Sequence, residues 1–177
     1  MAAESTELHR IKRYGRALRL FILGLMWLTP VIVVFLVLWR GPLAFATVPH
    51  NVDVNMAALN FPSSLAIITV GLLTPATFLV GFWFLYRLFT LYSQGVVFSE
   101  RNVTAIRRCG YVLMAVDIVR IVQSALTGPV LTALGAVKGY LTIQIGFSTL
   151  IVGLAIVMIS HVMSLGCKLY ESDRLTI

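Results

Sequence analysis

LRLFILGLMWLTPVIVVFLVLW, residues 18–39, holds a single charged side chain, Arg19. An α-helix needs about 20 apolar residues to cross the hydrocarbon core of a bilayer. Because lipid offers the backbone no hydrogen-bonding partner, a spanning segment must satisfy its own N–H and C=O groups as a helix. This stretch therefore predicts a membrane-spanning helix, and it sets the class of the whole chain.

Three further apolar stretches have the length of a span. They cover residues 65–88, 109–126 and 143–165, and the stretch 109–126 is interrupted by Asp117, Arg120 and Gln123. Of the 177 residues, 59% are hydrophobic and only 12% are charged, whereas soluble domains are about 25% charged. We therefore expect an all-α fold, a single integral membrane domain over residues 1–177 built as a four-transmembrane-helix bundle.

Lysine and arginine residues predict the orientation. They gather before the first span, between the second and third spans, and after the fourth, whereas the other two connections carry only Arg40 and Lys138. The three groups are Arg10, Lys12, Arg13, Arg16 and Arg19, then Arg87, Arg101, Arg107 and Arg108, then Lys168 and Arg174. The positive-inside rule then places both termini in the cytoplasm, N-in/C-in. We assign the net charge of +7 to topology and to contact with the lipid bilayer, and we predict no direct nucleic acid binding.

The first span also has an alternative interpretation as a cleaved signal peptide, because Ala44-Phe45-Ala46 follows it as an A-x-A pattern. We expect a retained span, since the apolar run exceeds the about 7–15 residues of such a peptide. Before this span, the basic segment is either a short interfacial helix on anionic headgroups or a tail that only sets the topology.

The connection between the second and third spans is the most patterned segment. Gly95 is a good residue to end one helix, and Ser99 is a good N-cap for the next. Val103, Ile106 and Gly110 then recur at helical spacing, so one face is apolar or small and should pack on the bundle or on a partner. We predict a cytoplasmic partner surface formed here by Phe98, Arg101, Asn102, Arg107 and Arg108.

The same connection and the C-terminal tail carry a family resemblance. The residues are Leu85-Tyr86-Arg87-Leu88-Phe89, Gly95, Phe98, Asn102, Ile106-Arg107-Arg108, Gly110, and Leu175-Thr176-Ile177 after Glu171 and Asp173. Through them the chain resembles a bacterial family of small four-span proteins known as domain of unknown function 2975, although Cys109 and Arg174 depart from its pattern. The resemblance implies a multi-pass protein of the bacterial inner (plasma) membrane. Because members are often encoded beside a small helix-turn-helix regulator, it also implies a cytoplasmic regulator of that kind as partner.

Polar residues inside the third and fourth spans form the candidate functional site. Asp117 and Arg120 are three positions apart, hence on one helix face, and Ser124 extends that polar stripe. His161 is expected within about a helical turn of Asp117 if the two spans are antiparallel neighbours, unless it is a buried histidine bonded to Ser160 or Ser164. Charges inside a bilayer are costly and mark functional sites. The alternative is a self-neutralised ion pair that only fixes helix packing.

Prolines and glycines predict the shapes of the spans. Pro30 and Pro75 lie inside the first and second spans, and each should kink its helix because proline lacks the backbone N–H. Gly146 and Gly153, with Ala155, predict a small face on the fourth span for close helix approach.

Enzyme and metal motifs are missing from the sequence. The two cysteines, Cys109 and Cys167, lack CxxC spacing, so we predict no metal site, no cofactor and no enzymatic activity. We expect a regulatory or scaffolding membrane protein that senses a membrane signal and engages a cytoplasmic partner. The alternative is a small proton-linked transporter or channel subunit around the predicted Asp117, Arg120 and His161 cluster, which would need a homo-oligomer to form a pore.

Overall fold

The computed structural model describes residues 2–46, 48, 52–55, 59–94 and 99–175, and the secondary-structure elements within these residues are all helices. The elements are α1 (Ala2–Arg40), the 3-10 helix η1 (Pro42–Phe45), α2 (Phe61–Gly71), α3 (Leu73–Ser93), α4 (Glu100–Ala133) and α5 (Ser148–Leu175). Four stretches are long and apolar enough to cross a membrane: Arg13–Arg40, Leu73–Ser93, Glu100–Ala133 and Ser148–Leu169. The predicted all-helical membrane fold is confirmed at this level.

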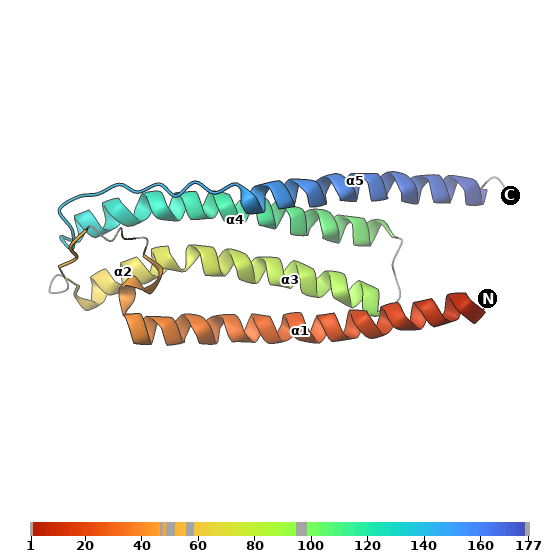
Figure 1. Ribbon diagram of the computed structural model, residues 1–177, viewed down its shortest axis with the longest axis horizontal. Coiled ribbons are helices and arrows are strands. Elements are labelled where there is room, and N and C mark those ends of the chain that lie inside the picture. Colours follow the sequence, from red (N-terminus) through yellow and green to blue (C-terminus); the bar gives the residue numbers. More distant parts are fainter. Residues whose placement is uncertain (1, 47, 49–51, 56–58, 95–98, 176–177) are drawn as a thin grey trace.

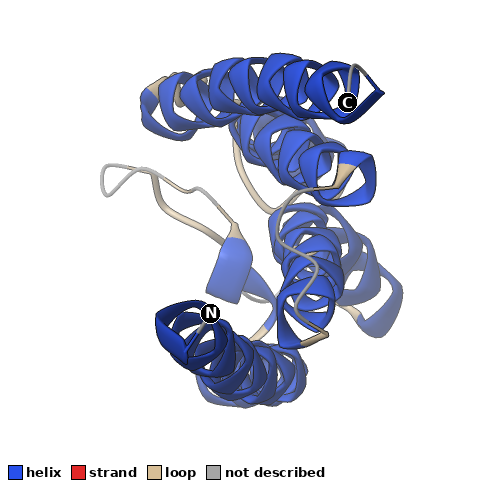
Figure 2. Ribbon diagram, turned by 90° about the vertical axis from the view of Figure 1, so that its right-hand side faces the viewer, coloured by secondary structure: helices blue, strands red, loops and turns tan. Residues whose placement is uncertain are grey.

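The helices form an open row (Figures 1 and 2). The helix α3 packs against α1 on one side and α4 on the other, and α4 packs against α5. Within the described ranges, no comparable contact joins α1 to α4 or to α5. The predicted bundle is therefore not closed. Lipid tails cover an apolar helix face as well as another helix does, so no hydrophobic force closes such a row.

Both chain termini lie at one end of the row (Figure 1). We call it the basic end, because the side chains of Arg19, Arg87, Arg101, Arg107 and Arg108 belong to the helix segments there. The opposite end holds the small hydrophobic core, in which Ile67 of α2 packs with Leu131 of α4 and with Ala136.

Two helix boundaries differ from the prediction on the N-terminal side of the chain. The first span is confirmed over residues 18–39, but its helix starts at Ala2, so the basic segment is neither a separate interfacial helix nor a frayed tail. The second predicted span, residues 65–88, is divided at Leu72 into α2 and α3. Pro75 follows this division, whereas α1 runs unbroken past Pro30.

The other two spans also need correction. The helix α4 extends beyond residues 109–126 in both directions, and Ser99 caps its start by accepting a hydrogen bond from the Asn102 N–H, as predicted. The predicted fourth span, residues 143–165, is wrong at its start because the helix begins only at Ser148.

Residues 139–147 run as extended chain back along α4 (Figure 1). Gly135 and Gly139, with φ of 70° and 99°, make the turn that reverses the chain after α4, and such values favour glycine. Leu141, Ile143, Ile145 and Phe147 are exposed in the following segment, as is Gln144, whereas Thr142 and Gly146 are half-buried. Successive side chains of an extended chain point to opposite sides, so this segment is exposed on both of its sides.

The closest helix pair, α4 and α5, meets at two glycines. A Cβ atom added to Gly153 would lie 2.6 Å from the Gly110 carbonyl oxygen and 2.7 Å from Cγ of Met114. The predicted small face of the fourth span is therefore used at Gly153. Gly146, which belongs to the extended segment, is not part of that helix face.

Gly153→Leu should force α4 and α5 apart and lower the free energy of unfolding by about 1–3 kcal/mol, the usual cost of overpacking. Gly166→Leu is the matched control on the same helix, because a Cβ atom there meets nothing within 4 Å. Thermal unfolding of the purified proteins in detergent measures the difference. Equal melting temperatures for the two variants would contradict this packing.

Candidate functional site

Contacts at the basic end indicate how deep in the membrane the candidate site lies. Arg19 Nη2 donates a hydrogen bond to Tyr86 Oη at 2.8 Å, and the Arg108 guanidinium lies 5.9 Å from the centroid of the Phe84 ring. From Arg19 the helix α1 runs to Arg40 without another charge, a rise of about 30 Å, which equals the usual hydrocarbon thickness. Thr29, halfway between, therefore lies near the middle of the membrane-spanning stretch.

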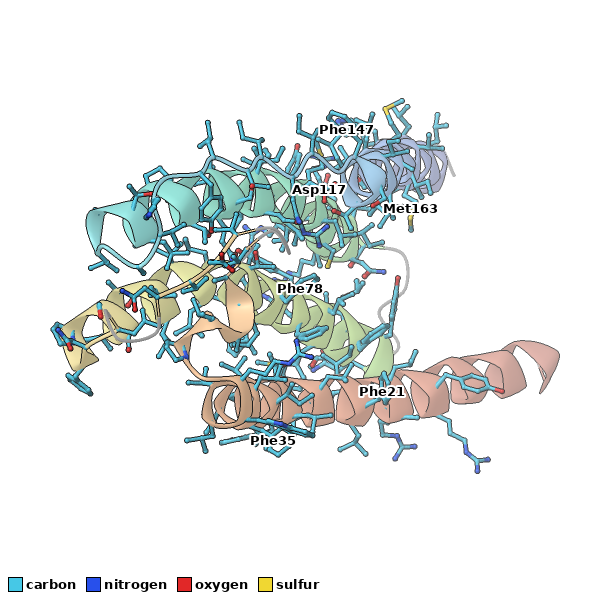
Figure 3. The ribbon with its side chains drawn as sticks, turned by 60° about the vertical axis from the view of Figure 1, so that its left-hand side comes forward. Phe21, Phe35, Phe78, Asp117, Phe147 and Met163 are labelled. Carbon is cyan, nitrogen blue, oxygen red and sulfur yellow. The ribbon has the colours of Figure 1, made fainter. Side chains whose placement is uncertain are left out.

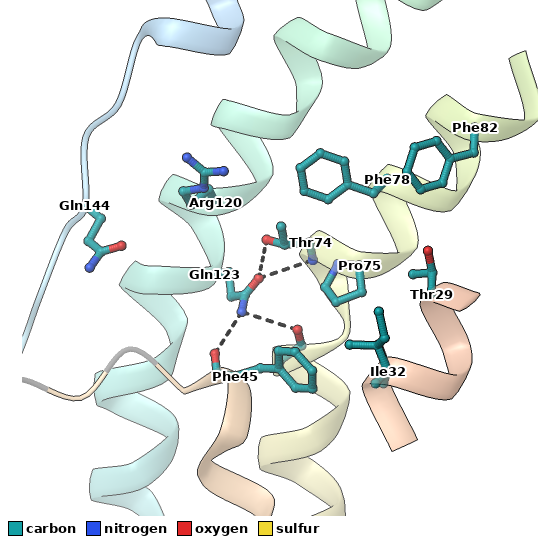
Figure 4. Close-up of a pocket in the computed structure, with 12 residues that line it drawn as sticks. Thr29, Ile32, Phe45, Thr74, Pro75, Phe78, Phe82, Arg120, Gln123 and Gln144 are labelled. Atoms are coloured by element: carbon teal, nitrogen blue, oxygen red, sulfur yellow. Dashed lines mark hydrogen bonds between the residues drawn. The ribbon is translucent and has the colours of Figure 1, made fainter. Parts of the chain in front are cut away.

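The break between α2 and α3 lies at this middle level and is closed by one side chain from α4 (Figure 4). Because Pro75 has no N–H, the carbonyl of Gly71 loses its helical partner. Gln123 Nε2 instead donates to the Gly71 oxygen at 3.3 Å and to the Phe45 oxygen at 3.2 Å. Its Oε1 accepts hydrogen bonds from the Thr74 N–H, at 3.2 Å, and from the Thr74 hydroxyl. All hydrogen-bonding capacity of the Gln123 side chain is thus used on α2, α3 and η1.

A second polar contact joins α4 to the start of α5. Asp117 is only 1% exposed, and its Oδ2 accepts a hydrogen bond from the Leu150 N–H at 2.8 Å. Leu150 is in the first turn of α5, where backbone N–H groups have no partner within the helix. A carboxylate is also favoured at this positive end of the helix dipole. Asp117 therefore serves as an N-terminal cap supplied from a neighbouring helix, and Figure 3 shows it between α4 and α5.

Arg120 is the ion-pair partner that the spacing predicts. Its Nη1 lies 3.7 Å from Asp117 Oδ1, which is too long for a hydrogen bond, and its side chain is 39% exposed. Within the part of the chain that the structure describes, this is its single polar contact. The guanidinium therefore keeps hydrogen-bond donors for another partner.

Ser124 continues the same face of α4. It is buried, donates to the Ile121 oxygen at 2.8 Å and accepts from the Gln144 N–H at 3.1 Å. Asp117, Arg120 and Ser124 thus lie together along the start of α5 and the extended segment before it. Sequence reasoning missed Gln144 and Leu150, because they take part through backbone N–H groups that any residue carries.

His161 does not belong to this group. It is exposed, its Nδ1 lies 3.0 Å from the Val157 oxygen, and it is 11 residues, or about 16 Å, along α5 from Leu150. Its neighbour Ser160 instead accepts a hydrogen bond from Arg107 Nε at 3.3 Å. The expected depth was wrong because the later start of α5 and the glycine contact with α4 shift His161 toward the basic end.

The predicted partner surface is only partly exposed. Arg101 and Arg108 are exposed, and Arg107 is half-buried against α5. Asn102 is 0% exposed, so its placement on this surface was wrong: it lies on the face of α4 that includes the buried Val103. Phe98 lies outside the described residues.

A cavity of about 470 Å³ lies at the middle level between α1, α3, α4 and the extended segment (Figure 4). Its walls are Thr29, Ile32, Val33, Phe45, Gly71, Thr74, Pro75, Phe78, Phe82, Arg120, Gln123 and Gln144. Most of this lining is apolar, and the only charged side chain in it is Arg120. No group of three His, Cys, Asp or Glu side chains that could hold a metal occurs among the residues the structure describes.

Comparisons with known proteins give one match. No curated protein and no solved structure matches the chain. The family model described as "Protein of unknown function (DUF2975)" matches residues 1–177. The resemblance seen in the motifs around residues 85–110 and in the C-terminal tail is thereby confirmed, and the chain belongs to the DUF2975 family.

Proposed function

We propose that this membrane protein is a regulatory or scaffolding component of the bacterial inner membrane, which senses a signal at mid-membrane and engages a cytoplasmic partner. The observation that carries the proposal is the continuity of α4. This one helix bears exposed Arg101 and Arg108 near its start, and Asp117, Arg120 and Gln123 near its middle.

The proposed orientation is four spans with both termini in the cytoplasm. It is supported by the gathering of arginines at the basic end, where both termini lie, because basic residues in short connections are retained on the cytoplasmic side. The exposed Arg101 and Arg108 would then face the cytoplasm or the lipid headgroups, where a partner can reach them.

A signal at the middle can reach the basic end through α4 and α5. The two helices are joined at Asp117–Leu150, at Gly110–Gly153 and at Arg107–Ser160. Close packing favours their movement as a pair, and shifts of packed helices are a common switching motion. A ligand would drive such a shift only by binding one arrangement better than the other.

The transporter alternative has no support from the position of His161. It depended on a proton-responsive group of Asp117, Arg120 and His161, and His161 lies about 16 Å along α5 from the residue that Asp117 contacts.

The partner surface is tested with the double change Arg101→Glu and Arg108→Glu. Co-expressed with a helix-turn-helix regulator of the kind that the family resemblance implies, the variant should retain less than about a tenth of the regulator, because reversing charges at an interface costs several kcal/mol. Lys138→Glu, an exposed reversal near the opposite end, should retain all of it. Co-purification of the two proteins measures the effect.

Reversed charges can also invert a membrane protein, so orientation is measured in the same variants. Single cysteines at Gln94 and Asn51, in a background where Cys109 and Cys167 are replaced by serine, are treated with an impermeant thiol reagent in intact cells. Only the Asn51 position should label. Undiminished co-purification from correctly oriented double variant would remove the partner surface from the proposal.

A further inference from the structure

The mid-membrane cavity combines an apolar wall with one cation. Ile32 and Val33 of α1 and the rings of Phe45, Phe78 and Phe82 form the wall. Figure 4 shows Arg120 on the α4 side of the cavity, across from Phe78. A volume of about 470 Å³ falls within the range of small-molecule sites, about 300–1,000 Å³. The cavity therefore has the size and lining of a ligand site.

Some polar groups of the lining are already hydrogen-bonded within the protein, and others are not. Gln123 spends both N–H donors and its oxygen on the helix break, and the Thr29 hydroxyl donates to the Leu25 oxygen at 2.7 Å. The Arg120 guanidinium and the Gln144 side-chain amide make no hydrogen bond within the described part of the chain. The groups that remain for a ligand are therefore the guanidinium N–H donors of Arg120 and the amide of Gln144, which offers two N–H donors and one acceptor oxygen.

The local charge favours an anion. Asp117 offsets Arg120 only at 3.7 Å, and its other oxygen is bonded to the start of α5. That helix end adds roughly half a positive charge at the same place. At the helix break, the negative dipole end of α2 and the positive dipole end of α3 lie together, so their partial charges largely cancel. The surroundings of Arg120 are thus net positive in a low-dielectric medium, where an unmatched charge is costly.

We propose that this cavity binds an amphiphilic anion with a single apolar chain, whose carboxylate or phosphate group contacts Arg120 and Gln144 while its chain lies along the phenylalanine wall. The guanidinium fork suits either group, because both present two oxygens to parallel N–H donors. The inference deepens the proposed function, on which it rests for its role: the bound amphiphile would be the signal that the protein senses.

Equilibrium binding of radiolabelled oleate to the full-length protein in neutral detergent tests the site. Wild type should bind oleate at least about tenfold more tightly than oleyl alcohol, the discrimination expected from one charge-assisted hydrogen bond. Arg120→Gln should abolish this preference, and Arg120→Lys should keep most of it. Lysophosphatidate, measured alongside, separates the two head groups: the tighter of the two anions identifies the natural one.

Two further variants keep the test valid if Arg120→Gln does not fold. Phe78→Ala should weaken oleate and oleyl alcohol alike by about tenfold, since it removes part of the chain's wall. Phe35→Ala, an exposed phenylalanine outside the cavity, should leave both unchanged. Equal affinity of wild type for oleate and oleyl alcohol, or equal effects of the two phenylalanine changes, would overturn the site. If the anions do not bind at the cavity but the regulator still co-purifies, the ligand proposal would be wrong and the proposed function would stand.

Discussion

Asp117→Leu is expected to lower the free energy of unfolding by about 3–5 kcal/mol, because it leaves Arg120 without a counter-charge inside the membrane. Arg120→Leu should cost a similar amount, since Asp117 is 1% exposed and would keep its contact with the Leu150 N–H but lose its counter-charge. Replacing both residues by leucine removes the unmatched charge. The double variant should therefore be more stable than either single variant.

The stability of these variants also depends on the hydrogen bond between Asp117 and α5. Asp117 also caps α5, and two leucines do not replace that hydrogen bond. A second double variant, Asp117→Asn with Arg120→Leu, has no charge but keeps a side-chain oxygen for the Leu150 N–H. It should exceed the double leucine variant by about 0.5–2 kcal/mol, the usual value of an N-cap.

Unfolding in mixed micelles measures all four variants against wild type. We expect wild type to be the most stable, followed by Asp117→Asn with Arg120→Leu and then by the double leucine variant. The two single leucine variants should be the least stable. If the single changes leave stability unaltered, Asp117 and Arg120 do not lie in the membrane interior. If the two double variants are equally stable, the cap contributes nothing.

The sequence was sufficient for features that depend on one segment alone. The apolar run of residues 18–39 predicted its helix, and the spacing of Asp117, Arg120 and Ser124 predicted their common face on α4. Ser99 predicted the start of α4 because a hydroxyl before a helical pattern satisfies a free N–H.

Features that depend on contacts with another segment could not be predicted from the sequence. Residues 143–147 continue the apolar character of the membrane-spanning helix that follows them, and a short apolar run alone does not distinguish a helix from a strand. The turn at Gly135 and Gly139 and the hydrogen bond from Gln144 to Ser124 hold them extended against α4. Because this extended segment runs alongside α4, α5 begins beside Asp117, and His161 lies about 16 Å farther along α5 toward the basic end.

The role of Gln123 was missed for a related reason. Three of its four hydrogen-bond partners are backbone groups of Gly71, Thr74 and Phe45, which have no signature in the sequence. One signal was present: Pro75 frees the carbonyl four residues earlier, so a polar side chain from another span was needed to satisfy it.

Gln123→Leu should accordingly be among the most destabilising changes in the chain. It leaves the carbonyls of Gly71 and Phe45 and the N–H of Thr74 without a partner, at about 1–3 kcal/mol each. A loss of about 3 kcal/mol or more is expected in mixed-micelle unfolding. A loss below about 1 kcal/mol would mean that water or another group satisfies the helix break.

Pro75→Ala tests whether the proline creates the need for Gln123. In the wild-type background Gly71 is already bonded to Gln123, so the change should have a small effect. In the Gln123→Leu background alanine supplies the missing N–H, lets α2 continue into α3, and should recover about 1–3 kcal/mol. Pro30→Ala in the same background controls for the general gain of removing a helical proline, because no hydrogen bond of Gln123 reaches α1. The double-mutant cycle isolates the coupling. A recovery no larger with Pro75→Ala than with Pro30→Ala would show that Gln123 stabilises the protein by some means other than closing the break that Pro75 opens.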